Sequence, residues 1–86
     1  MSREELHSAA EIKEYIYNKL SQAGIKREDI RDDSELIEER LISSIVLVQI
    51  IAGIEDILDT IVLTDDIGID EFTTIHKMMA VVSKYL

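Results

Sequence analysis

Apolar residues recur at helical spacing through the first quarter of the chain. Ser8-Ala9-Ala10-Glu11 has the spacing of a capping box, which marks the start of many helices. The residues that follow on one helical stripe are Ile12, Tyr15, Ile16, Lys19, Leu20 and Ala23. Gly24 then interrupts the stripe, and Ile25 is positioned to make the hydrophobic contact that accompanies many helix stops. The pattern predicts a helix from about Ala9 to Ala23.

The segment from Ile25 to Ile42 has no helical period and is rich in charged side chains. It predicts a long loop that isolated apolar anchors hold to the core. Within the loop, Asp33 or Ser34 can cap a short helical turn that carries Leu36 and Ile37. The expected anchors are Ile25, Ile30, Leu36 and Leu41. A connection of this length is uncommon in a small domain and is more often functional or disordered than incidental.

From Ser44 to Leu58 the chain is almost continuously apolar until Glu55 and Asp56. The run is too long for a typical strand, although its β-branched residues also suit one, and a buried helix is therefore favoured. At helical spacing the core face comprises Leu47, Ile50, Ile51, Ile54 and Leu58. The opposite side carries Val46, Gln49, Gly53 and Asp56. The flank carries Val48 and Ala52, where a partner could make contact.

The last third of the chain predicts a connector, one helical turn and a final helix. Asp59 to Leu63 is the connector, and residues 65–70 have room for the turn. Thr73 or Thr74 then caps the last helix. Its apolar residues, at helical intervals, are Ile75, Met78, Met79, Val82 and Leu86. We therefore predict an all-α fold: one domain over residues 1–86 with four helices, a long first loop and a short third helix.

Composition narrows the class of partner. Eighteen acidic against nine basic residues give a formal charge of -9, which argues against nucleic acid or an anionic membrane as the partner. Basic protein surfaces are the natural complement, and solubility alone is the simpler alternative. Without cysteine, the chain has no disulfide or thiolate chemistry of its own. The first residues hold no apolar signal core and no run reaches membrane-spanning length, so we expect a cytoplasmic monomer without membrane insertion.

Candidate chemistry concentrates at Arg40-Leu41-Ile42-Ser43-Ser44-Ile45, where the charged loop meets the apolar helix. A serine at this junction can carry a covalent group, because the free amides and the positive dipole end of a helix favour an attached phosphate. Serine is also one of the commonest N-cap residues, and a cap needs no chemistry. The local pattern alone favours capping.

The order of elements and several motifs resemble the acyl carrier protein family over roughly Glu11 to Leu86. The motifs are Asp33-Ser34-Glu35-Leu36, Glu39-Arg40-Leu41-Ile42-Ser43-Ser44-Ile45, Glu55-Asp56-Ile57-Leu58 and Phe72-Thr73-Thr74-Ile75. In that family the carrier serine usually stands in an Asp-Ser-Leu motif, and Ser44 followed by Ile45 matches it. The resemblance implies a covalent 4'-phosphopantetheine on Ser44, with an acyl group held as a thioester on its distal thiol. It implies a carrier without catalytic activity that serves fatty-acid, lipid or secondary-metabolite synthesis.

The resemblance also implies two sets of contact residues. In the family, an acyl chain can enter between the second and third helices. The candidate lining residues here, for which ordinary core packing is the alternative, are Leu47, Ile51, Ile54, Ile67, Ile69 and Met79. The expected partners are a phosphopantetheinyl transferase and acyl-transferring or condensing enzymes with basic docking surfaces. Their candidate contacts are Ile45, Val46, Val48, Gln49, Ala52, Glu55 and Asp56.

Two features depart from the family pattern. Ser43 stands where the family usually has an aspartate that helps to hold the metal ion and coenzyme A in the transferase. A hydroxyl is a poorer ligand than a carboxylate for a hard divalent cation, which predicts slow modification by a general transferase or the need for a dedicated one. On the second helix, Val46, Gln49 and Gly53 replace acidic residues that housekeeping carriers expose. This indicates a specialised carrier.

Three other interpretations compete with the carrier. A serine hydrolase would need a base, yet no Gly-x-Ser-x-Gly elbow is present and neither His7 nor His76 has an identifiable orienting partner. Weak calcium binding by the acidic residues Asp65, Asp66, Asp70 and Glu71 is a further interpretation. Their spacing is not that of an EF-hand loop, so a solvated acidic loop is the favoured interpretation. The main alternative is an unmodified acidic interaction module with the carrier fold, in which Ser44 is only an N-cap.

Overall fold

The computed structural model describes residues 9–86, and all regular structure in this part is helical. The α-helices are α1 (Ala9–Gln22), α2 (Ser44–Leu58) and α3 (Ile75–Val82). Three short 3₁₀ helices are η2 (Arg27–Asp29), η3 (Ile69–Phe72) and η4 (Ser83–Tyr85). No helix in residues 9–86 is both long and apolar enough to cross a membrane. The predicted all-α class is confirmed for the described part, and the proposed capping residue Ser8 lies outside it.

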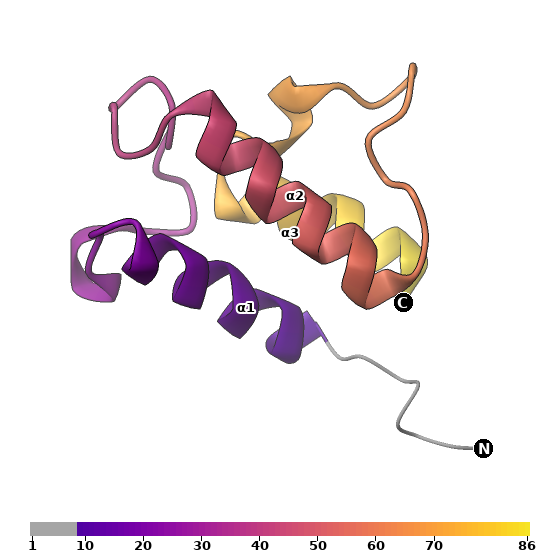
Figure 1. Ribbon diagram of the computed structural model, residues 1–86, viewed down its shortest axis with the longest axis horizontal. Coiled ribbons are helices and arrows are strands. Elements are labelled where there is room, and N and C mark those ends of the chain that lie inside the picture. Colours follow the sequence, from indigo (N-terminus) through magenta and orange to yellow (C-terminus); the bar gives the residue numbers. More distant parts are fainter. Residues whose placement is uncertain (1–8) are drawn as a thin grey trace.

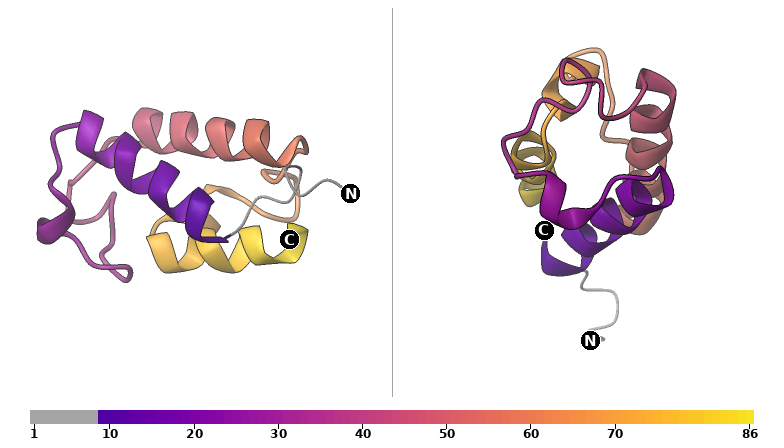
Figure 2. Two further views of the ribbon diagram at one scale, coloured as in Figure 1. Left: turned by 90° about the horizontal axis from the view of Figure 1, so that it is seen from below. Right: turned by 90° about the vertical axis from the view of Figure 1, so that its left-hand side faces the viewer.

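The three α-helices lie alongside one another. Figure 1 shows α1 and α2 running in opposite directions, while α3 lies beside α2 and follows its direction. The loop between α1 and α2 closes one end of the molecule, as both views of Figure 2 show. Because α2 and α3 point the same way, the segment 59–74 returns along the length of α2. This return brings η3 into contact with α2.

One contiguous apolar core joins the three helices. The predicted stripe of α1 supplies Ile12, Ile16 and Leu20, all fully buried. Of the five residues predicted for the core face of α2, four are buried and Leu58 is half-buried. Burying one such aliphatic side chain contributes roughly 1.5–3 kcal/mol. The buried apolar residues are Ile12, Ile16, Leu20, Ile30, Leu36, Ile42, Leu47, Ile50, Ile51, Ile54, Val62, Phe72, Ile75, Met78, Val81 and Val82.

The side of α2 opposite its core face is partly covered by α1. A Cβ added at Gly53 would overlap the phenol of Tyr15, so a larger residue here would force that ring to move. Val46, on the same side, is half-buried and packs against the core. Glycine inside a helix costs about 1 kcal/mol relative to alanine, and here it lets the Tyr15 ring of α1 lie close to the backbone of α2. The face of α2 that stays open is therefore narrower than the sequence pattern predicts.

Left-handed residues end both longer helices. The stop predicted at Gly24 is confirmed: its φ is 94°, and the amide of Ile25 donates to the Leu20 carbonyl at 3.0 Å. α2 ends in the same way, with Asp59 at φ 55° and the Thr60 amide donating to the Glu55 carbonyl. These are the hydrogen bonds of the Schellman motif, which satisfy the last carbonyls of a helix.

The long loop forms a helical turn and contacts the start of α3. The predicted cap from Asp33 or Ser34 is wrong: the Ser34 hydroxyl accepts from the Arg31 amide behind it at 2.9 Å, and within residues 9–86 the Asp33 carboxylate accepts from no amide of the turn. The turn that begins at Glu35 is held instead by Glu39, whose carboxylate accepts from the Glu35 amide. Two backbone hydrogen bonds then join the loop to α3: Leu36 N to Thr73 O at 2.9 Å, and His76 N to Asp32 O at 2.8 Å.

The short third helix predicted over residues 65–70 is not an α-helix. The Thr64 hydroxyl accepts from the amides of Asp66 and Ile67, which holds this part of the segment as a turn. Gly68 is extended, and only the 3₁₀ helix η3 follows it. The predicted count of four helices is therefore not confirmed: residues 9–86 contain three α-helices.

Candidate functional site

Ser43, not Ser44, is the N-cap of α2. Its backbone is extended, with φ -86° and ψ 165°, and its hydroxyl accepts from the Val46 amide at 3.3 Å. A side-chain acceptor at this position satisfies one of the amides that the first turn leaves free. The interpretation of Ser44 as the cap is therefore wrong.

Ser44 is the first residue of α2 and is exposed. Its hydroxyl has no hydrogen-bond partner within residues 9–86, in contrast to the hydroxyl of Ser43. The amides of Ser44 and Ile45 also lack intrahelical acceptors, because they belong to the first turn. An accessible hydroxyl thus lies next to two free amides at the positive end of the helix.

A cavity of about 450 Å³ opens beside Ser44. Four separate parts of the chain surround it: the helical turn of the long loop, α2, the η3 region and α3. The lining residues are Glu35, Ile37, Glu38, Ser44, Leu47, Ile69, Asp70, Thr73 and Lys77. Most of them were named from the sequence for separate reasons, and Glu38 and Lys77 are the two to which it assigned no role. The family resemblance implied that Leu47 and Ile69 lie near each other, whereas no pattern in the sequence indicated that the loop residues Glu35 to Glu38 and Lys77 lie beside them.

The six candidate acyl-pocket residues are distributed over different environments. Leu47 and Ile69 line the cavity beside Ser44. Ile51 and Ile54 lie in the core, with at most 1% of their surface exposed. Ile67 and Met79 are half-buried, pack against the core and do not line this cavity. The structure therefore brings two of the six to the serine.

The candidate partner contacts are also divided. Ile45 and Val48 are exposed to 70% and 44%, and Ala52 continues their stripe along α2. Gln49 and the half-buried Val46 instead line a cavity of about 290 Å³ against the end of α1. The open stripe of α2 consequently comprises Ile45, Val48 and Ala52.

The two carboxylates at the end of α2 differ in what they contact. Glu55 is half-buried, and its Oε2 accepts from the amides of Val62 and Leu63, each at 3.0 Å. It thereby holds the connector against the helix, a structural role that its position in the sequence does not indicate. Asp56 is exposed. Of the two, Asp56 has the more accessible carboxylate.

Asp32 fixes the loop that forms one wall of the cavity. Lys13 Nζ donates to one of its carboxylate oxygens, and Tyr17 Oη donates to the other at 2.7 Å. Both hydrogen bonds lower the pKa of Asp32 below its ordinary value, and the one from Lys13 has the larger effect. The pKa of the Tyr17 phenol is raised, mainly by burial and to a smaller extent by the hydrogen bond to Asp32. Asp32 thus joins the loop to α1 by its side chain and to α3 by its carbonyl.

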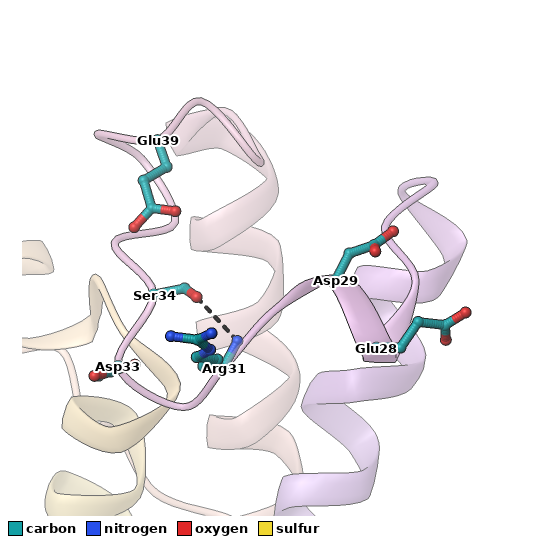
Figure 3. A pocket seen from close by; sticks show the side chains of 6 residues that line it. All are labelled: Glu28, Asp29, Arg31, Asp33, Ser34 and Glu39. Atoms are coloured by element: carbon teal, nitrogen blue, oxygen red, sulfur yellow. Dashed lines mark hydrogen bonds between the residues drawn. The ribbon is translucent and has the colours of Figure 1, made fainter.

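A second cavity, of about 570 Å³, is surrounded by charged loop residues. Figure 3 shows Glu28 and Asp29 pointing away from Arg31 and Ser34. Arg31 and Ser34 are joined by the hydrogen bond already described and by a second one, from the Ser34 amide to the Arg31 carbonyl at 3.1 Å. The lining residues are Glu28, Asp29, Arg31, Asp33, Ser34 and Glu39. Within residues 9–86, no group of three or more acidic or histidine side chains could hold a metal ion.

The hydrolase interpretation gains no geometric support. His76 is exposed on α3 and does not line the cavity beside Ser44. His7 lies outside the described residues. A Ser–His pair needs hydrogen-bond reach between its members, and no histidine is among the residues that line the cavity beside Ser44.

Comparison with models of known protein families, with curated proteins and with solved structures gives no match for this chain. The inference of function therefore depends on the residues around Ser44.

Proposed function

We propose that this protein is an acyl carrier with a 4'-phosphopantetheine group attached to Ser44. The observation that carries the proposal is the difference between two adjacent serines. Ser43 caps α2, whereas the Ser44 hydroxyl is exposed, free of hydrogen bonds within the described residues and next to a cavity of about 450 Å³. Capping does not account for Ser44, and the resemblance to the carrier family gives its hydroxyl a role.

The start of α2 suits a phosphodiester. The amides of Ser44 and Ile45 are free to donate, and the helix dipole favours a negative charge at this end. Lys77 lines the same cavity and adds a positive charge. The cavity is also lined by the carboxylates of Glu35, Glu38 and Asp70, which repel a phosphate. The attraction for the phosphate therefore comes from the start of α2 and from Lys77, not from the cavity as a whole.

Attachment requires only the Ser44 hydroxyl from this chain. Ser44 Oγ would form a bond to the phosphorus next to the pantetheine of coenzyme A, while the bond from that phosphorus to the bridging oxygen breaks. Adenosine bisphosphate leaves, and the hydroxyl proton passes to a base on the transferase. Once bound, the group supplies the thiol that a chain without cysteine lacks.

The surface beside Ser44 suits partner enzymes with both apolar and basic groups. The exposed stripe of Ile45, Val48 and Ala52 begins next to the attachment residue. The formal charge of -9 favours encounter with a basic surface. A tethered cargo also has a high effective concentration at each partner site. These properties support delivery of a bound intermediate, with the chemistry performed by the partners.

A second candidate is an unmodified interaction module. The 70% exposure of Ile45 favours it, because an exposed apolar stripe is typical of a docking surface whether or not a neighbouring residue is modified. In this case Ser44 remains a free serine.

Intact-mass measurement separates the two candidates. The full chain is coexpressed with a phosphopantetheinyl transferase of broad specificity. The carrier predicts the added mass of one phosphopantetheine group, which is lost in Ser44→Ala. The matched variant Ser43→Ala removes the neighbouring hydroxyl and should keep the addition. If several transferases add nothing to the folded chain, the interaction module is favoured.

A further inference from the structure

Arg40 is the single charged residue between Glu39 and Glu55, a stretch of the sequence that contains Ser44. The chain as a whole is acidic, with a formal charge of -9. The Arg40 side chain is exposed, and within residues 9–86 it forms no ion pair. The neighbouring Glu39 carboxylate accepts instead from the Glu35 amide. A guanidinium with unused hydrogen-bond donors therefore precedes α2.

The backbone of Arg40 has a conformation that arginine rarely adopts. Its φ is 59°, in the left-handed region that is unfavourable for most residues other than glycine. Its amide donates to the Ile37 carbonyl at 2.9 Å, and the Leu41 amide donates to the Leu36 carbonyl at the same distance. These are the hydrogen bonds of a Schellman motif, in which the left-handed residue is usually glycine, as at Gly24. Strain of this kind is concentrated at functional sites.

Arg40 precedes both the attachment residue and the exposed apolar stripe. Three residues separate it from Ser44, so the two Cα atoms are at most about 14 Å apart. Ile45 follows Ser44 and is 70% exposed, and Val48 continues the stripe one turn later. The first turn of α2 contains no acidic residue. An enzyme that acts on the Ser44 hydroxyl must therefore approach a surface that combines a positive charge with aliphatic side chains.

The charge at this surface is opposite to that of the whole chain. Net charge acts mainly on the rate of encounter, whereas a contact depends on the groups that meet. Arginine binds a carboxylate through two parallel hydrogen bonds, and it is common among the residues that dominate binding. A basic residue opposite Arg40 would be repelled. The matching surface therefore presents a carboxylate to Arg40 and apolar side chains to Ile45 and Val48.

We propose that the transferase that modifies Ser44 binds the surface formed by Arg40, Ile45 and Val48 through a carboxylate flanked by apolar side chains. The inference rests on the proposed carrier function and specifies how one partner recognises the attachment residue. At this contact it reverses the basic docking surface that the net charge alone favours. The strained backbone at Arg40 is then retained because its side chain serves recognition.

Removal of one positive charge at each of two positions tests the ionic contact. The probe is the transferase that adds mass to the full chain in the coexpression experiment. Calorimetric titration without coenzyme A gives its Kd for the unmodified chain, and the rate of mass addition gives KM. Arg40→Gln should raise both by about tenfold. The matched control is Arg31→Gln, which should leave both unchanged or lower, because Arg31 is an exposed loop residue without an ion pair in residues 9–86.

Two exposed isoleucines test the apolar part of the contact. Ile45 is 70% exposed next to Ser44, whereas Ile61 is 66% exposed in the connector beyond the other end of α2. Ile45→Ser should raise Kd by about fivefold or more, and Ile61→Ser should leave it unchanged. Arg40→Gly should also weaken binding while its Tm is no lower than that of the unsubstituted protein, because glycine relieves the left-handed strain. The weaker binding then cannot come from a loss of fold.

Two results would overturn the proposed contact. A Kd that is unchanged or lower in Arg40→Gln contradicts it, because a basic transferase surface gains from the removal of a positive charge. Equal weakening in Arg40→Gln and Arg31→Gln also contradicts it, because that pattern reflects the charge of the whole chain and not a contact at Arg40.

Failure of the carrier function has a different signature. If no transferase adds mass at Ser44 of the unsubstituted chain, the carrier function is wrong and the inference fails as well. If mass is added and Arg40→Gln binds as tightly as the unsubstituted chain, the carrier function stands and only the docking surface is wrong.

Discussion

The starts of α2 and α3 use the same capping interaction in opposite environments. In each, a hydroxyl accepts from the backbone amide three residues later: Ser43 from Val46 at 3.3 Å, and Thr74 from Lys77 at 2.9 Å. Ser43 is exposed, whereas only 4% of Thr74 is exposed. Each cap satisfies one amide that the first turn of its helix leaves free, and the two helix starts differ in how far the rest of the chain covers them.

The long loop covers the start of α3 and leaves the start of α2 open. Backbone hydrogen bonds from Leu36 to Thr73 and from His76 to Asp32 join the loop to α3. At α2, the residue after the cap is exposed beside a cavity. One helix start is thus part of the packed structure, whereas the other presents a hydroxyl to the solvent. Substitutions at the start of α3 should therefore change mainly the stability of the fold, whereas substitutions at the start of α2 should change it little.

The largest effect is expected at the buried cap. Thr74→Ala removes the acceptor of the Lys77 amide at a part-buried cap whose threonine is only 4% exposed, and should lower the free energy of unfolding by about 2 kcal/mol. Urea denaturation measures the difference. Thr74→Ser keeps the hydroxyl and should retain most of the stability. Equal losses in the two variants would show that packing of the threonine methyl, not the cap, stabilises this end.

The exposed cap should contribute less. In Ser43→Ala the Val46 amide loses its acceptor but can bond to water, so the free energy of unfolding should fall by about 0.5 kcal/mol. Ser43→Asp restores an acceptor and adds a negative charge at the helix start, which should recover this loss. A loss at Ser43 as large as the loss at Thr74 would contradict the contrast between the two helix starts.

A smaller, pH-dependent effect is expected where Asp32 joins the loop to α1. Hydrogen bonds from Lys13 and Tyr17 lower its pKa below the ordinary value of 3.8. Its contribution to stability is therefore fully present above pH 3.8 and is lost as the pH falls through the lower pKa of the folded state. The Lys13–Asp32 pair is 37% and 42% exposed, so solvent screening reduces its contribution to about 0.3 kcal/mol.

Denaturation of Asp32→Asn across acidic and neutral pH measures this contribution. The variant should be slightly less stable than the unsubstituted protein at neutral pH, and the difference should shrink in acid. Asp33→Asn is the matched control, because Asp33 is exposed and has no ion pair within residues 9–86. A difference between Asp32→Asn and the unsubstituted protein that stays constant with pH would mean that the ion pair does not contribute.

Much of the fold could be predicted from local pattern. The bounds of α2 agree with the predicted range from Ser44 to Leu58, and α1 ends one residue before its predicted end. Both helices combine an apolar stripe with a stop signal, and these are short-range features. In place of the predicted third helix the structure has a turn followed by the 3₁₀ helix η3, because the Thr64 hydroxyl accepts from nearby amides and holds them as a turn. The sequence pattern does not say which interaction prevails.

The site was less predictable, because it depends on contacts between distant segments. Adjacent serines have identical cap chemistry, and only the backbone conformation assigns the cap to Ser43. Glu55 looks like a surface charge, but the reversal at Asp59 brings the connector amides to its carboxylate. The cavity beside Ser44 likewise forms only when the return of the chain brings Thr73 near α2. Contacts between segments that are distant in the sequence leave no local sequence pattern from which they could be predicted.

The smallest effect on stability is expected at the residue with the largest proposed role. Ser44 is not the cap of α2 and its side chain has no hydrogen bond within the described residues, while alanine is the better helix former. Ser44→Ala should therefore change the free energy of unfolding by less than about 0.3 kcal/mol in urea denaturation. The same variant should lose all phosphopantetheine addition by intact mass. Since Ser43→Ala should do the reverse, losing stability and keeping the modification, the two variants together test whether adjacent hydroxyls have separate roles. A marked loss of stability in Ser44→Ala would assign the hydroxyl to the fold and remove the main argument for the carrier.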